Sequence, residues 1–303
     1  MSVIGLLVAF GGGIFGAAIG ALPAFAFVGI LTMLGVGIQL AVAPAATDFF
    51  GILFGVFGPH VRGFASGVAA AAYAASKQKL DSGRNIVIAG MVLNSPDVLL
   101  VGGIFGIIGY VIVWLVGMVP DFGPGLAWTD YPGMCVVISA FIVRFTWGTC
   151  GLCGKKPEGE RFFYPTDATK WLAFQSGPGQ LVLIGIGVGL FGGWLGVTYG
   201  TPGALLAFGI TAASLLFLTV GVLTPVTYHI ALPAAIVGAA SGSVVLAGVA
   251  GLICAFVGEF YARIFLDRGD THIDPLACTI ATMTLVFNFL TSVGFWALLP
   301  IPI

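Results

Sequence analysis

The stretch DYPGMCVVIS, residues 130–139, has a near echo in IDPLACTIAT, residues 273–282. In each stretch an acidic residue and then Pro-x-x-Cys begin an apolar run. Two further pairs of stretches recur in the same order: GIFGAAIG (13–20) with GLFGGWLG (189–196), and GVFGP (55–59) with GVLTP (221–225). Three matches in one order predict an internal duplication of the chain.

Composition assigns the chain to the membrane proteins. Hydrophobic residues make up 59% of the 303 residues and charged residues only 8%, which is too little polar surface to cover a water-soluble protein of this length. Apolar runs close to the ~20 residues that cross a bilayer recur from one end to the other. No basic residues precede the first run, so we expect it to be a span and not a cleaved signal.

The apolar runs divide into five spans in each predicted repeat. The expected spans are 3–22, 26–45, 60–79, 97–119 and 132–147, then 180–199, 203–222, 226–241, 243–262 and 275–298. The predicted organisation is a first membrane repeat (1–147), a cytoplasmic linker (148–177) and a second membrane repeat (178–303). The fold class is an all-α polytopic membrane protein of about ten transmembrane helices in two inverted-topology repeats, with broken or re-entrant segments.

The direction of each repeat follows from its basic residues. Most of the eleven Lys and Arg residues lie in three clusters, at 77–84, 144–170 and 263–268. Basic residues near span ends accumulate on the cytoplasmic side. If all three clusters are cytoplasmic, equivalent spans of the two repeats run in opposite directions, both termini lie outside, and the protein resides in the cell (inner) membrane.

The two opening stretches predict helix starts. Asp130 and Asp274 stand before a proline, where a short acidic side chain caps the N–H groups of the first turn. Inverted-repeat transporters also bind small ions at paired helix starts. The free N–H groups of a helix start slightly favour an anion as the bound ion. Asp48 is a third candidate of this kind, either as a cap at the surface or inside a cavity.

Polar residues that interrupt apolar runs are the candidate substrate ligands, because a polar group at membrane depth is costly unless it faces a cavity or a partner. Proline breaks the third span of each repeat and leaves backbone carbonyls unpaired. A second interruption lies at 94–97, before the fourth span, with a serine-containing counterpart at 239–246. The candidates are His60, Arg62, Asn94, Ser95, Asp97, Thr227, Tyr228, His229 and Ser241.

The cysteines leave alternatives open. Cys135 and Cys278 could ligate a metal or an iron–sulfur cluster if the helix starts meet, or they could be small apolar residues. Cys150 and Cys153 have the spacing of half a zinc site or a redox pair. No metal or other cofactor is expected. Glu259 should pair with Arg263 one turn away, and Arg144 should extend toward the headgroups.

These features favour a secondary transporter for a small solute or ion. A channel or facilitator would use the same repeat, and a membrane subunit of a redox-driven or ion-translocating complex is a third possibility. The chain has no nucleotide-binding G-x-x-x-x-G-K-[ST] motif, and its histidines and acids form no recognisable catalytic set, so no enzyme is expected. The expected partners are membrane lipid, the transported solute and further copies of the chain, without nucleic acid.

Overall fold

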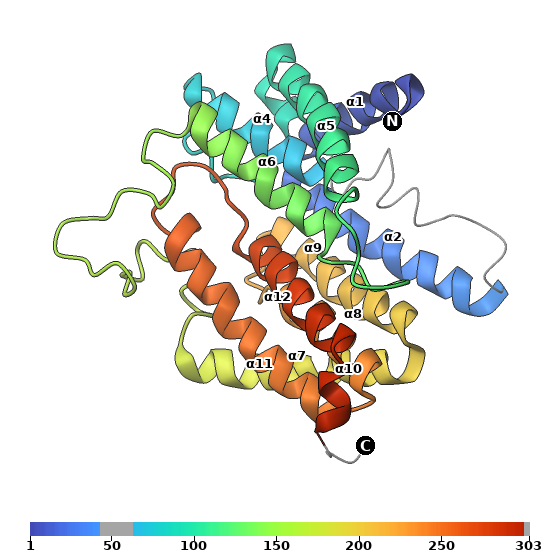
Figure 1. Ribbon diagram of the computed structural model, residues 1–303. Coiled ribbons are helices and arrows are strands. Elements are labelled where there is room, and N and C mark those ends of the chain that lie inside the picture. Colours follow the sequence, from blue (N-terminus) through green and yellow to red (C-terminus); the bar gives the residue numbers. More distant parts are fainter. Residues whose placement is uncertain (43–62, 300–303) are drawn as a thin grey trace.

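The computed structural model describes residues 1–42 and 63–299, and within these ranges all regular elements are helices (Figure 1). The first half contains α1 (Val3–Ile19), α2 (Ala21–Val42), α4 (Ala65–Ser76), η2 (Gly90–Leu93), α5 (Pro96–Val116) and α6 (Tyr131–Trp147). The second half contains α7 (Pro178–Tyr199), α8 (Thr201–Ala213), α9 (Leu215–Thr219), α10 (Tyr228–Ser241), α11 (Val244–Tyr261), η3 (Ala262–Leu266), α12 (Pro275–Ser292) and η4 (Phe295–Leu298). The predicted all-α architecture is confirmed.

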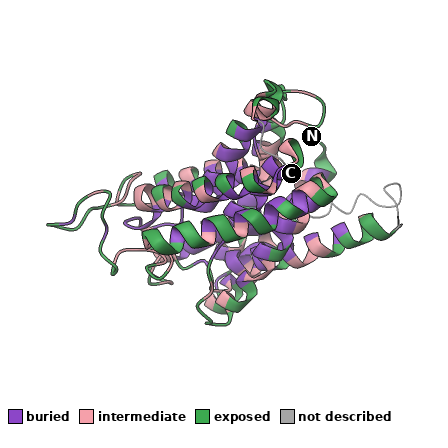
Figure 2. Cartoon of the chain, turned by 90° about the horizontal axis from the view of Figure 1, so that it is seen from below, coloured by how far each residue is buried: buried purple, intermediate pink, exposed green. Residues whose placement is uncertain are grey.

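Six helical segments in the described chain are long and apolar enough to cross a membrane. They are Ala21–Ala41, Pro96–Val116, Pro178–Tyr199, Thr201–Thr219, Val244–Leu266 and Pro275–Ser292. The helices α1, α6 and α10 are apolar but shorter. Large apolar side chains such as Leu100 and Leu183 are exposed, as contact with lipid requires, and exposed residues follow the outward faces of the helices (Figure 2). These findings support a multi-pass membrane protein, while the count of ten crossings stays a prediction.

Glycine allows close helix packing at equivalent places in the two halves. Gly13 of α1 lies against Gly106 of α5, and Gly189 of α7 lies against Gly251 of α11. A Cβ atom on Gly13 would lie 2.3 Å from a carbonyl oxygen of α5. Without a hydrophobic driving force in lipid, such backbone contacts carry much of the packing energy. The pair α1/α5 therefore packs as the pair α7/α11 does.

The remaining contacts repeat in the same way. In the first half α4 packs on α5 and α6, and in the second half α10 packs on α11 and α12. The halves meet where α2 packs on α8 and α6 packs on α12. Gly29 lies against Ala213 and Met33 lies against Gly209, so α2 and α8 are antiparallel.

The predicted break before the fourth span is present. The apolar sequence that begins at residue 86 forms only the short η2, and α5 starts at Pro96 with Ser95 as its N-cap. Asn94 between them has a φ of 47°, in the left-handed region. In the second half Ser243 is the N-cap of α11, and its hydroxyl accepts a hydrogen bond from the Leu246 N–H. The repeated stretch GVFGP (55–59) lies outside the described residues.

Arg144 is buried, so the expectation that it extends toward the headgroups is wrong. Its side chain is 1% exposed. The guanidinium donates to the Thr271 hydroxyl at 2.6 Å, to the Thr271 carbonyl at 2.8 Å and to the Leu152 carbonyl at 2.7 Å. The carbonyl oxygens accept the hydrogen bonds that water would accept from an exposed guanidinium. These bonds connect the end of α6 to the linker and to the loop before α12.

The three basic clusters come together at one end of the molecule, called here the linker end. This end comprises the linker, the loop 77–95 and the loop 267–274. Arg84 donates to the Asp267 carbonyl at 3.2 Å, and the Arg268 guanidinium donates to the Glu160 carboxylate at 2.6 Å. Hydrogen bonds from the Thr166 N–H and from Arg268 lower the pKa of Glu160 to about 2. The linker is therefore held to the helix ends by a buried ion pair.

Candidate substrate site

Two aspartates begin equivalent helices, one in each half. The Asp130 carboxylate accepts a hydrogen bond from the Gly133 N–H at 2.6 Å and caps α6. The Asp274 carboxylate accepts one from the Leu276 N–H at 3.1 Å and caps α12. The capping role predicted for both residues is confirmed.

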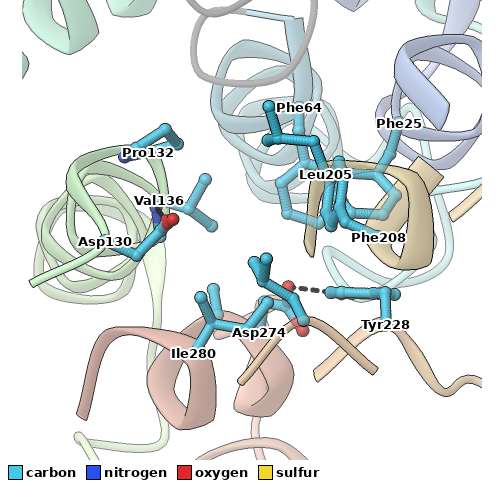
Figure 3. A pocket seen from close by; sticks show the side chains of 13 residues that line it. Phe25, Phe64, Asp130, Pro132, Val136, Leu205, Phe208, Tyr228, Asp274 and Ile280 are labelled. Carbon is cyan, nitrogen blue, oxygen red and sulfur yellow. Dashed lines mark hydrogen bonds between the residues drawn. The ribbon is translucent and has the colours of Figure 1, made fainter. Parts of the chain in front are cut away.

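Asp130 and Asp274 line one cavity of about 120 Å³. They lie on two sides of it, with the aromatic side chains of Phe25, Phe64 and Phe208 on a third (Figure 3). Asp274 is 3% exposed and Asp130 is partly buried. Because α6 and α12 come from different halves, the cavity lies where the halves meet, and we call it the central cavity.

The two halves contribute matched residues to this cavity. Gly133 and Val136 follow Asp130 at the same intervals at which Ala277 and Ile280 follow Asp274, and all of them line the cavity. This register aligns the aspartates and places the two cysteines one position apart. The aspartates, and not the Pro-x-x-Cys motif, are thus equivalent in space.

Two phenylalanines at the cavity were missed in the sequence, although a signal was present. Phe25 ends the stretch ALPAF (21–25) and Phe208 ends ALLAF (204–208). Their rings meet edge to face with centroids 5.7 Å apart. The two stretches are a fourth match between the halves, and they give the cavity an apolar wall from α2 and α8.

Tyr228 is the one predicted substrate ligand of the described chain that lies at the central cavity. Its hydroxyl donates to the Asp274 carboxylate at 2.9 Å, as the dashed line in Figure 3 shows. Its ring centroid lies 4.5 Å from that of Phe25. Tyr228 is the first residue of α10, so this bond joins the starts of α10 and α12.

A second cavity, of about 500 Å³, continues from the central one. We call it the vestibule; the two share Asp130, Pro132, Leu205 and Leu232. Further along, α12 presents Thr284, Asn288 and Thr291, and α10 presents Ile236, Ala239 and Ala240. One stripe of α10 and one of α12 therefore run from the central cavity toward the helix ends opposite the linker.

His229 faces a third, much smaller cavity of about 20 Å³ near the linker end. The ring is 2% exposed and its Nδ1 atom has no hydrogen-bond partner. The volume suffices for a single water molecule. Linker residue Gln175 lines the same cavity and exchanges two hydrogen bonds with the backbone of Val226. His229 and Tyr228 thus line different cavities although they are neighbours in the chain.

The other predicted ligands lie elsewhere. The Asp97 carboxylate accepts from the Tyr73 hydroxyl at 2.9 Å and from the Lys79 ammonium at 3.1 Å, with Ser95 beside it. Asn94 is exposed on the same turn.

Ser241 ends α10, where its hydroxyl donates to the Val237 carbonyl. Thr227 precedes α10 and does not line the central cavity. His60, Arg62 and Asp48 lie outside the described residues.

The cysteines are dispersed. The Cys135 thiol donates to the Gly109 carbonyl, and Cys278 belongs to the main apolar core. Cys150 lies 3.0 Å from the Asp270 carboxylate, and burial raises the pKa of its thiol. Cys153 forms no disulfide with Cys150.

Across residues 1–42 and 63–299, no three His, Cys, Asp or Glu side chains come together as a metal site would require. Glu259 and Arg263 form the predicted ion pair at 2.8 Å.

A family model described as "Family of unknown function (DUF7973)" matches the chain in two segments, residues 1–164 and 165–299. The chain belongs to this family. The boundary between the two matched segments falls within the predicted linker. Neither a curated protein nor a solved structure matches the chain. The function of this DUF7973 protein is therefore argued from its own geometry.

Proposed function

We propose that the protein is a secondary transporter, a permease for a small solute or ion, that works by alternating access between two inverted repeats. The observation that carries the proposal is the central cavity, to which the two halves contribute Asp130 and Asp274 from equivalent helix starts. Transporters with inverted repeats hold their substrate at such an interface, between helices that begin near mid-membrane. The role proposed is transport and not catalysis.

The inverted arrangement is supported by helix direction. The equivalent helices α2 and α8 run antiparallel. Gly133, near the start of α6, lies against Ala277 of α12, whereas Arg144, near the end of α6, bonds to Thr271 before α12. The pair α6 and α12 is therefore antiparallel as well. The family match in two segments is what a duplicated chain would produce.

One-sided access supports transport by alternating exposure. The vestibule leads from the end opposite the linker to the central cavity. Toward the linker end, the described part of α6 is packed into the main core through Ala140 and Val143, and Arg144 closes the layer behind them. Such a shape corresponds to one of the two states of a carrier, open to one side.

We propose further that the linker end faces the cytoplasm and that the protein lies in the cell inner membrane. The three basic clusters, which the positive-inside rule assigns to the cytoplasm, are joined there by Arg84, Arg144 and Arg268. The partners that we propose are membrane lipid, the transported solute or ion and a second copy of the chain.

Reconstitution into proteoliposomes tests the function. A carrier should give flux that saturates with substrate concentration and is accelerated by unlabelled substrate on the opposite side, whereas a channel should give continuous, much faster downhill flux. Asp274→Asn and Asp130→Asn should abolish flux while the protein still inserts. Asp97→Asn, which removes a carboxylate distant from the central cavity, is the matched control. Unchanged flux in both cavity variants would contradict the site assignment.

A further inference from the structure

Linker residues 170–176 form a short segment that lies over the helix ends, and we call it the cover segment. The Trp171 side chain packs against the main apolar core. Its N–H donates to the Asp267 carboxylate at 2.9 Å. Gln175 exchanges two hydrogen bonds with the backbone of Val226. These contacts fasten the linker to the loop after η3 and to the residues before α10.

His272, in the loop before α12, lies beneath the cover segment. Its ring is 2% exposed. It meets the ring of Trp171 edge to face, with the centroids 6.2 Å apart. The ring of Phe64 lies on another side, with the centroids 6.0 Å apart. A charge on an imidazole enclosed in this way would lose its hydration, and release of Trp171 would open one side of the ring to water.

The charges around His272 oppose a proton on it. Burial, together with the positive charges of Arg84 from the loop 77–95 and Arg144 from α6, lowers the pKa of His272 to about 3. The neighbouring carboxylates accept hydrogen bonds from other groups: Asp267 from Trp171, Asp270 from Thr149 and Asp274 from Tyr228. His272 is therefore neutral while the cover segment is in place.

A second histidine lies beneath the same segment. His229 is 2% exposed, and its Nδ1 atom has no hydrogen-bond partner. The small cavity beside it is lined by five residues of the cover segment, Lys170, Trp171, Leu172, Gln175 and Ser176. The charged groups at this cavity have partners already: Lys170 pairs with Asp167, Glu259 with Arg263, and Asp267 accepts from Trp171. The cover segment thus lies over both histidines of the described chain.

We propose that His272 is a proton-binding site that controls the cover segment: acidification on the linker side protonates the ring and releases the segment. Below pH ~6.5 the released state, whose imidazole is in water, binds a proton that the covered state does not bind. The covered state is therefore fully stable above pH ~6.5, and each pH unit below this value favours release by up to about tenfold. The effect on access to the central cavity from the linker side rests on the transporter function proposed above.

Hydrogen–deuterium exchange of the purified full chain tests the release. The protection factor, which divides out the direct effect of pH on exchange, is measured for the amides of residues 170–176. It should fall about tenfold between pH 7.5 and pH 5.5 if His272 alone takes a proton, and up to about 100-fold if His229 does so as well. The amides of α1 should keep their protection, which separates local release from unfolding of the whole chain.

Variants identify the group that titrates. His272→Gln should reduce the fall about tenfold, and the double variant with His229→Gln should show no fall. If His272→Gln fails to fold, His272→Phe keeps a ring beside Trp171 and cannot bind a proton, so it should give the same result. Burial raises the pKa of Asp267, which makes this carboxylate the competing group, and Asp267→Asn should keep the fall.

Two results would overturn the inference: an unchanged fall in His272→Gln, or a fall that disappears in Asp267→Asn. Flux in proteoliposomes separates this inference from the proposed function. A pH-dependent release in a protein without flux would leave the proton site standing and refute the transporter. Saturable flux with protection that does not change with pH would do the reverse.

Discussion

The helices α6 and α12 begin alike and end differently. Beyond Ile280, α12 presents Thr284 and Asn288 to the vestibule. Beyond Val136, the equivalent positions of α6 hold Ala140, which belongs to the closed apolar core, and Arg144, whose guanidinium is bonded to buried carbonyls at the linker end. One helix therefore leads from the central cavity to an open end, and its partner leads to a packed one.

This difference indicates which part of the molecule must move to expose the central cavity to the other side of the membrane. Small apolar side chains such as Ala140 pack without polar bonds, so they can separate at modest cost. The polar contacts that close the linker end lie one layer further out, at Arg144 and at the Arg268–Glu160 pair. The closed end therefore depends on a few hydrogen-bonded side chains. Three predictions follow that comparison from the largest effect on stability to the smallest, and a fourth concerns pH.

Arg144→Met should have the largest effect. The change leaves the carbonyls of Leu152, Phe265 and Thr271 unpaired in a buried place. Removing one side of such a buried polar network costs about 3–5 kcal/mol. Arg263→Met, which removes a partly exposed ion pair, should cost at most about 1 kcal/mol. Thermal unfolding in detergent measures both; equal losses would show that Arg144 does not hold the linker end.

Glycine substitutions compare the two halves directly. Gly13→Ala and Gly189→Ala place a Cβ against backbone of the neighbouring helix, so each should cost about 1–3 kcal/mol through overpacking. A Cβ atom on Gly11 or on Gly187 would meet no atom within 4 Å. Gly11→Ala and Gly187→Ala should therefore stabilise the protein by up to about 1 kcal/mol, because alanine favours the helix. Urea or thermal titration gives the values. A loss in one half only would contradict equivalent packing.

Tyr228→Phe should cost about 1 kcal/mol of stability, because it removes one hydrogen bond and keeps the ring. The larger consequence should be functional, since the Asp274 carboxylate loses the donor that orients it. We expect the apparent affinity for the transported ion to fall several-fold while insertion is unchanged. Tyr261→Phe, outside the central cavity, is the control. An unaltered affinity would remove Tyr228 from the site.

The last prediction concerns the pH dependence of the ion pair between Arg268 and Glu160. The folded-state pKa of Glu160, about 2, lies below the ordinary value of about 4.3. Its contribution to stability is therefore fully present above pH ~4.3 and is lost as the pH falls toward 2. Pepsin cleavage near Phe162 should be faster in Glu160→Gln than in the wild-type chain at pH 4, and the two rates should converge at pH 2. A difference independent of pH would contradict the ion pair.

Much of the fold could be predicted from the sequence because proline, glycine and serine mark helix ends directly. Pro96, Pro178 and Pro275 each begin a helix where the apolar pattern indicated one. Local capping is a property of a few adjacent residues. The interruption at 94–97 was found for the same reason.

The site could be predicted only in part, because it depends on how deep each helix start lies. Asp130 and Asp274 were recognised as paired starts, yet their placement at one cavity follows from the contact between α6 and α12. Asp97 also lies at a helix start, directly after Pro96, but pairs with Lys79. Arg144 was misread because its carbonyl partners, including those of Phe265 and Thr271, are distant in the sequence. Spacing along the chain does not encode such contacts.

Thiol labelling from each side of the membrane tests the central claim most directly. In a chain whose five cysteines are replaced, a single cysteine at Ala277 reports on the central cavity, and one at Ala140 reports on the packed face of α6. A small membrane-impermeant reagent should modify the Ala277→Cys variant at least about tenfold faster from the side opposite the linker, and should leave Ala140→Cys unmodified from that side. Equal rates for Ala277→Cys from both sides, as in a continuous pore, or no reaction from either side, would contradict a carrier site open to one side.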